Sequence, residues 1–167
     1  MNKPLKYLSH YPPELLARVE QLLAAGQVAA MLAQKYPQSH PVQSDPALYQ
    51  YVSQLKARHF RHAPALAKVC FDPKIRVVQH ALGLHTQIAR VQGHKLKSKN
   101  EIRIASIFKQ LPADFLRMIV VHELAHLKEK EHNRAFYQLC EHMEPNYQQL
   151  EFDLRLYLTA QEWPSLD

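Results

Sequence analysis

The sequence predicts an α+β fold in which a small antiparallel sheet packs on a central helix, with further helices before and after it. Apolar residues recur at helical spacing near both ends of the chain. Short alternating segments lie between positions 64 and 106, and the run from Met118 to Leu127 is apolar apart from three polar side chains. With 167 residues, 47% of them apolar, the chain can form the core of one compact domain.

The first part of the chain is expected to be helical. Residues 13–25 begin with proline and carry apolar residues at helical spacing, and residues 28–36 form a second helix that Pro37 ends. Asp45 and Pro46 are typical of a helix start, which predicts a helix over 46–62. Its inner face should contain Leu48, Tyr51, Val52, Leu55 and Phe60. We expect residues 1–63 to form a helical region that precedes a core of residues 64–167.

The middle of the chain is expected to form the sheet. Strands are predicted over 68–71, 75–79, 84–91 and 101–106, with a polar turn region over 92–100. Because the connections between successive strands are shorter than a parallel crossover requires, we expect antiparallel pairing.

The last third is expected to be helical again. Leu111, Pro112 and Asp114 are typical of a helix start, residues 133–143 form the next helix, and residues 146–162 form an amphipathic one. The inward stripe of the last helix should contain Tyr147, Leu150, Leu154, Tyr157 and Leu158.

The pattern His-Glu-x-x-His occupies positions 122–126. On a helix, His122 and His126 lie on one face and can direct two imidazoles at one ion. Zinc accepts neutral imidazole and keeps a position for water, and Glu123 is placed to take a proton from that water. An amphipathic helix with incidental histidines explains the run less well, because three buried polar side chains need partners.

A third ligand is needed, and His132 is the natural candidate. On one straight helix His132 would lie about 15 Å from His122, because each residue rises about 1.5 Å. The helix should therefore end near Glu129 or Lys130, with Asn133 capping the next helix and His132 at the corner between them.

Composition and charge restrict the function further. Residues 51–110 carry twelve Lys or Arg against two Asp or Glu, which suggests either an anion-binding surface or a solvated basic face. No run of eighteen apolar residues and no signal-peptide pattern is present, so no membrane association is expected. Cys70 and Cys140 are isolated in sequence and are expected to be reduced thiols, which favours the cytosol.

The run FLRMIVVHELAHLKEKEHNRAF, residues 115–136, resembles the YgjP-like metal-dependent hydrolases. The family pattern is His-Glu-Leu-x-His, five residues, His, three residues and an aromatic, and Phe136 supplies that aromatic. The resemblance implies a zincin-like fold and kinship with SprT-like and WLM-type proteases. An Arg-Trp-Gly-Ser-Cys element that many members carry is replaced by ARVQGHK at residues 89–95, so no role is transferred from it.

Three functions remain open. The first is zinc-dependent peptide hydrolysis with Glu123 as the base; candidates for the oxyanion donor are His85, His94, Arg117 and Tyr137. The second, implied by the resemblance, is UTP pyrophosphatase activity, in which Lys95, Lys97, Lys99 and Arg103 neutralise the triphosphate. The third is a nucleic-acid-binding module with a structural zinc, which Glu123 disfavours because a structural site needs no base.

Overall fold

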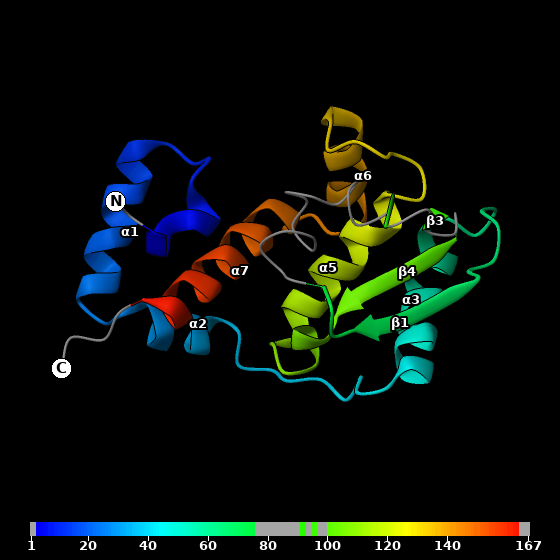
Figure 1. Ribbon diagram of the computed structural model, residues 1–167, viewed down its shortest axis with the longest axis horizontal. Coiled ribbons are helices and arrows are strands. Elements are labelled where there is room, and N and C mark those ends of the chain that lie inside the picture. The colour runs from blue at the N-terminus through cyan, green and yellow to red at the C-terminus, as the bar shows by residue number, and fades with distance from the viewer. Residues whose placement is uncertain (1–2, 76–90, 93–94, 97–99, 164–167) are drawn as a thin grey trace.

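The computed structural model describes residues 3–75, 91–92, 95–96 and 100–163 (Figure 1). It is an α+β structure in which helices surround a small sheet, as the sequence predicts. The elements in chain order are η1 (Lys3–Leu8), α1 (Pro13–Ala24), α2 (Val28–Lys35), α3 (Asp45–His59), β1 (Lys68–Asp72), β2 (Val91–Gln92), β3 (Lys95–Leu96), β4 (Glu101–Ala105), η3 (Ser106–Lys109), α5 (Ala113–Ala125), α6 (Arg134–Met143) and α7 (Tyr147–Glu162).

The prediction of an antiparallel main sheet is wrong. β1 and β4 pair in parallel, with Cys70 opposite Arg103. The prediction counted short connections between successive strands, whereas β1 pairs with a strand that follows only after residues 73–100. That connection is long enough for a parallel crossover. The strands predicted over 75–79 and 84–91 lie almost wholly in residues 76–90, outside the described residues.

A second, very short pair of strands overlaps the region predicted to be a polar turn, and its first residue, Val91, is the last residue of the strand predicted over 84–91. β2 and β3 pair antiparallel, with Val91 opposite Leu96 and Gln92 opposite Lys95. This antiparallel pairing was not predicted, and residues 93–94 between the two strands lie outside the described residues.

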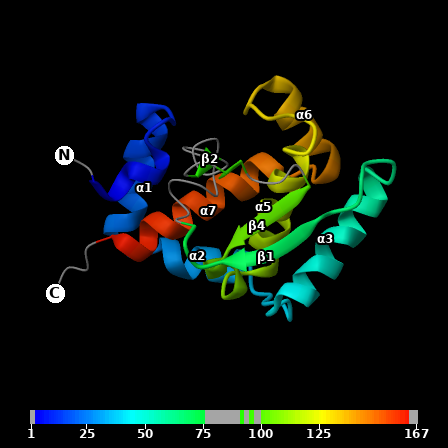
Figure 2. The same cartoon turned by 45° about the vertical axis from the view of Figure 1, so that its right-hand side comes forward.

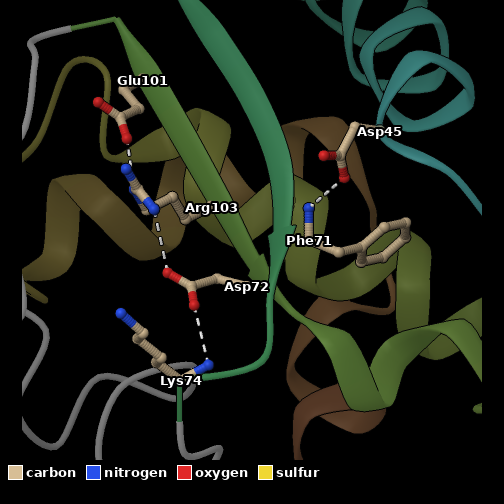
Figure 3. Close-up of polar contacts among 6 residues, drawn as sticks. All are labelled: Asp45, Phe71, Asp72, Lys74, Glu101 and Arg103. Carbon is tan, nitrogen blue, oxygen red and sulfur yellow. Dashed lines mark hydrogen bonds and ion pairs between the residues drawn. The ribbon is translucent and has the colours of Figure 1, made fainter.

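The sheet is covered by helices at its edge and on one face. Figures 1 and 2 show α3 alongside β1, and α5 next to β4. Ile102 and Ile104 of β4 are buried, while Glu101 and Arg103 alternate with them and stay partly exposed on the other face. Asp45, the first residue of α3, accepts a hydrogen bond from the backbone of Phe71 in β1 at 2.9 Å (Figure 3). This bond links the start of α3 to the backbone of β1.

Helix α5 is buried on nearly all sides. Ten of its thirteen residues are buried, including every residue from Met118 to Ala125. Such a helix is apolar all round rather than striped, which is typical of the centre of a core. It ends at Ala125, one turn earlier than the predicted end near Glu129 or Lys130. The chain then turns through residues 126–128, where the amides of Lys128 and Glu129 donate to the carbonyl of Ala125 at 3.1 and 3.0 Å.

The predicted inner faces of two other helices are largely confirmed. Leu48 and Val52 of α3 are fully buried and Phe60 nearly so, while Tyr51 and Leu55 are half-buried against the core. Tyr147, Leu150, Leu154 and Leu158 of α7 are buried, and Tyr157 is half-buried.

The N-terminal layer, defined as η1, α1 and α2, is fastened to α7. Lys35 pairs with Asp153 at 2.8 Å, and the hydroxyl of Tyr36 donates to the same carboxylate. Further along α7, Arg155 donates to the carbonyl of Tyr7 at 2.9 Å. α7 therefore lies between the N-terminal layer and α5. Among the described helices, none alone is long and apolar enough to cross a membrane, and only α1 and α2 together, bent by 98°, meet those limits.

Candidate metal centre

Three histidines meet where α5 ends and α6 begins. His122 lies in the last turn of α5, His126 follows the helix end, and His132 lies in the corner before α6. The Nε2 atom of His132 is 3.0 Å from that of His126 and 3.4 Å from that of His122. The early end of α5 and the reversal through the corner bring a residue ten positions from His122 back to it.

The corner has the N-cap that the sequence predicts. The side-chain oxygen of Asn133 accepts a hydrogen bond from the backbone of Phe136 at 2.9 Å, which satisfies an otherwise unpaired amide at the start of α6. The same side chain reaches back to the carboxylate of Glu129 at 3.4 Å. Asn133 thus fixes both the start of α6 and the exit of the turn, with His132 held between them.

The Nδ1 atoms of two of the histidines have hydrogen-bond partners. His126 Nδ1 lies 2.9 Å from the carbonyl oxygen of Glu129, and His122 Nδ1 lies 2.7 Å from the hydroxyl of Tyr147. A carbonyl oxygen only accepts hydrogen bonds, so Nδ1 of His126 carries the proton. In the neutral ring, Nε2 of His126 then presents a lone pair towards the other two histidines.

The three rings surround one phenyl group. The ring of Phe136 lies 5.0 Å from that of His122, 4.5 Å from that of His126 and 4.9 Å from that of His132, measured between ring centroids. Phe136 is fully buried, whereas His122 and His126 are 1% and 5% exposed. The centre therefore has an apolar floor, and two of its three histidines have little contact with solvent.

These histidines fit a bound metal ion. A divalent ion bonded to imidazole at about 2.0–2.1 Å in tetrahedral geometry places neighbouring ligand nitrogens about 3.3–3.4 Å apart. The Nε2 separation of 3.4 Å between His132 and His122 matches that spacing, and the 3.0 Å between His132 and His126 is a few tenths of an ångström shorter. Three nitrogen donors suit a first-row transition metal rather than magnesium or calcium, which prefer oxygen. His122, His126 and His132 can thus hold one metal ion.

Glu123 lies beside this centre on α5. It is 6% exposed and follows His122 directly. Behind the histidines, burial raises the pKa of the Tyr147 phenol well above its ordinary value and raises that of the Cys140 thiol as well. Both groups stay protonated near neutral pH, so neither adds a charge beside His122.

Two of the predicted substrate contacts are engaged elsewhere or buried. Arg117 of α5 pairs with Asp114 at 2.9 Å and with Glu144 at 2.6 Å. Burial lowers the pKa of Arg117, but these hydrogen bonds raise it above its ordinary value. Tyr137 of α6 is half-buried, and burial raises the pKa of its phenol to about 12. Its ring centroid lies 6.2 Å from that of Tyr147.

Arg103, predicted to contact a triphosphate, lies between two carboxylates on the outer face of the sheet (Figure 3). It pairs with Asp72 at 3.1 Å and also with Glu101. Burial lowers the pKa of Arg103, but the hydrogen bonds to these carboxylates raise it above its ordinary value. Lys95 is the first residue of β3. His85, His94, Lys97 and Lys99 lie outside the described residues.

Sequence reasoning missed the role of Tyr147. It was predicted as one member of the apolar stripe of the last helix, and the structure places its hydroxyl on His122. No spacing rule connects the two residues, because the contact depends on how α7 packs against α5. The contact between His126 and Glu129 uses a backbone carbonyl, which every residue has, so residue types could not have predicted it.

Comparison with known proteins agrees with this arrangement. Residues 38–157 match the family described as YgjP-like, metallopeptidase domain. A protein of Escherichia coli strain K12 named UTP pyrophosphatase is 57% identical over 155 residues, which cover 93% of each chain. No solved structure matches. The family match includes α5, α6, the corner between them and most of α7. The chain therefore belongs to the YgjP-like family and is a metal-dependent hydrolase.

Proposed function

We propose that the protein is a zinc-dependent UTP pyrophosphatase, which hydrolyses the nucleotide to its monophosphate and pyrophosphate. The observation that carries the proposal is the 57% identity to the Escherichia coli UTP pyrophosphatase over nearly the full length of both chains. The basic composition of residues 51–110 supports it, because a triphosphate needs several cations to neutralise it.

The metal in this proposal is zinc, held by His122, His126 and His132. Three imidazole nitrogens and a position for water are the usual set for catalytic zinc. When bound, zinc lowers the pKa of a water molecule towards neutrality and polarises a phosphoryl oxygen. The apolar ring of Phe136 packs against all three histidines and keeps water away from that side of the metal site.

Glu123 acts as the general base. Its carboxylate accepts a proton from the attacking water, whose oxygen forms a bond to the α-phosphorus of the nucleotide. The bond between that phosphorus and the bridging oxygen breaks, and pyrophosphate leaves with the electron pair. Glu123 then returns its proton to solvent or to a product oxygen. Because Glu123 is buried, few other water molecules compete with the attacking water for its carboxylate.

The chain's lysines are better candidates for phosphate contacts than Arg103. Lys95, Lys97 and Lys99 lie in the segment that leads into β4, and we assign them to the triphosphate. Arg103 is already paired with Asp72 and Glu101, so it adds little net positive charge. Arg117 is paired in the same way with Asp114 and Glu144. His85, His94 and the half-buried Tyr137 remain the proposed donors to the developing negative charge.

A second candidate function is peptide hydrolysis. The family description of a metallopeptidase domain favours it, and the same base and water serve either reaction. The third candidate function is that of a nucleic-acid-binding module with a structural zinc, and the same experiment distinguishes it.

The test is a substrate panel on the zinc-loaded full chain and on Glu123→Gln. We expect release of pyrophosphate from UTP by the wild type, with a loss of about 100-fold or more in Glu123→Gln. Zinc content should be equal in the two proteins, since glutamine removes the base and leaves the histidines. Cleavage of unstructured peptides without nucleotide turnover would replace the proposal with the second function. Salt-sensitive DNA binding without any turnover would favour the third.

A further inference from the structure

The histidines of the centre differ in what supports them. His126 donates its Nδ1 proton to a backbone carbonyl in the adjacent turn, that of Glu129. His122 instead contacts a side chain, the hydroxyl of Tyr147, at 2.7 Å and from a different helix. The partner of His122 Nδ1 is therefore a side chain that a substitution can remove, whereas the partner of His126 Nδ1 is part of the main chain.

Tyr147 is itself firmly held. It is the first residue of α7 and is fully buried. Its amide donates to the carbonyl of Glu144 at 2.9 Å. The Glu144 carboxylate in turn accepts from Arg117 of α5 at 2.6 Å and from the amide of Asn146 at 2.9 Å. The helix that carries His122 and the residue that contacts it are thus fastened together at a second point.

The hydroxyl of Tyr147 has a second polar neighbour, the side chain of Cys140 in α6. A phenol has one hydrogen to donate and lone pairs with which to accept. When that hydrogen is directed at the Cys140 sulfur, the oxygen accepts from Nδ1–H of His122, and Nε2 of His122 keeps its lone pair. In the reverse arrangement Nε2 of His122 carries a hydrogen, which blocks it as a ligand. Only the first arrangement suits three converging ligands.

We propose that Tyr147 is a positioning residue of the metal centre. Its hydroxyl accepts the Nδ1 proton of His122 and so holds this imidazole with the Nε2 lone pair directed at the point shared with His126 and His132. This inference rests on the proposed function only in taking the three histidines as metal ligands, and it does not depend on the substrate. Partners of this kind orient metal-bound histidines in other proteins, where the acceptor is usually a carboxylate or a carbonyl.

The first test compares Tyr147→Phe with Tyr157→Phe in the full chain. Each substitution removes one hydroxyl from α7, but Tyr157 packs against Phe115, with ring centroids 5.9 Å apart, and takes no part in the centre. Zinc affinity is measured by competition with a chromogenic chelator. We expect Tyr147→Phe to bind zinc about 10- to 100-fold more weakly. The Tyr157→Phe affinity should equal that of the wild type. Equal affinity in Tyr147→Phe and wild type would overturn the proposal.

The second test needs no substitution. Nitrogen-15 chemical shifts of the metal-free wild type report which ring nitrogen of His122 carries the proton. We expect protonation at Nδ1 before any metal is added, and loss of that preference in Tyr147→Phe. A hydrogen on Nε2 in the wild type would overturn the proposal even if the variant did not fold. A wild type that binds no zinc at all would instead contradict the metal assignment under the proposed function.

Discussion

The corner between α5 and α6 and the outer face of the β1–β4 sheet both collect polar side chains, in opposite ways. At the corner, three groups of the same kind direct their Nε2 atoms at one another. On the sheet face, one guanidinium lies between two carboxylates, so unlike groups satisfy one another (Figure 3). The first arrangement can hold a metal ion, whereas in the second the charges of the protein compensate one another.

The difference shows how charge counting along a sequence can mislead. Arg103 contributes to the excess of basic residues between positions 51 and 110, yet in the fold it is compensated by Asp72 and Glu101. The histidines of the corner add nothing to the formal charge, yet they form the group that can hold a metal. Convergence of like donors therefore identifies a site better than net charge does.

The largest expected effect is the loss of metal on replacing a corner histidine. His126→Ala removes one of three proposed ligands, and we expect zinc affinity to fall by more than about 100-fold, beyond the usual effect of removing an outer-sphere partner. The matched control is His142→Ala, because His142 is an exposed histidine of α6 next to His59. Metal analysis after gel filtration should show about one zinc per chain in the control. Equal metal content in both variants would remove the corner as the site.

A smaller effect is expected for the phenyl group beneath the histidines. Phe136 is fully buried, so Phe136→Ala should lower the free energy of unfolding of the metal-free chain by about 3–5 kcal/mol. Phe136→Leu, which keeps most of the volume, should cost less than about 1.5 kcal/mol. Urea unfolding with and without zinc measures both. If the leucine variant kept its stability but lost zinc affinity, the ring would act on the histidines rather than on packing alone.

A still smaller effect separates two helix caps, one in each region. Asn133 caps α6 beside the histidines, and Ser44 caps α3 beside the sheet through a bond of 3.2 Å to the amide of Ala47. Replacing either by alanine should lower the free energy of unfolding by about 1 kcal/mol. Only Asn133→Ala should also weaken zinc binding, because it releases the corner that holds His132. A matching loss of affinity in Ser44→Ala would show a general effect of stability.

The smallest effect is expected on the sheet face. Arg103→Gln removes a partly exposed ion-pair partner, which should change the free energy of unfolding by about 1 kcal/mol or less. Since the guanidinium is already neutralised, the KM for UTP should change less than in a variant with Lys95, Lys97 and Lys99 all replaced by glutamine. Steady-state kinetics at two salt concentrations measure both. A larger rise in KM for Arg103→Gln would assign that arginine to the substrate after all.

The parts that could be predicted from sequence are those that local rules determine. The proline-led helix starts, the Asn133 cap and the corner follow from residues within a few positions of one another. Even the convergence of His132 on the other two histidines follows from a length argument, because one straight helix would hold them too far apart.

What escaped prediction depends on packing between distant segments. The parallel pairing of β1 and β4 requires a choice among strand partners, and nearest neighbours in the sequence were the wrong choice. The early end of α5 follows from how the turn after Ala125 packs, and no proline or glycine marks it. The contact of Tyr147 with His122 joins two helices whose relative placement no periodicity encodes.

The attachment of the N-terminal layer to α7 also has a consequence for synthesis. Tyr7 contacts Arg155 and Glu162, partners that are about 150 positions away. At about 5–20 residues per second, a ribosome needs several seconds to tens of seconds to make that length of chain. During that interval the apolar faces of η1 and α2 have no α7 to cover them. The first segments made are thus among the last to reach their final contacts, and the same late helix brings Tyr147 to the metal centre.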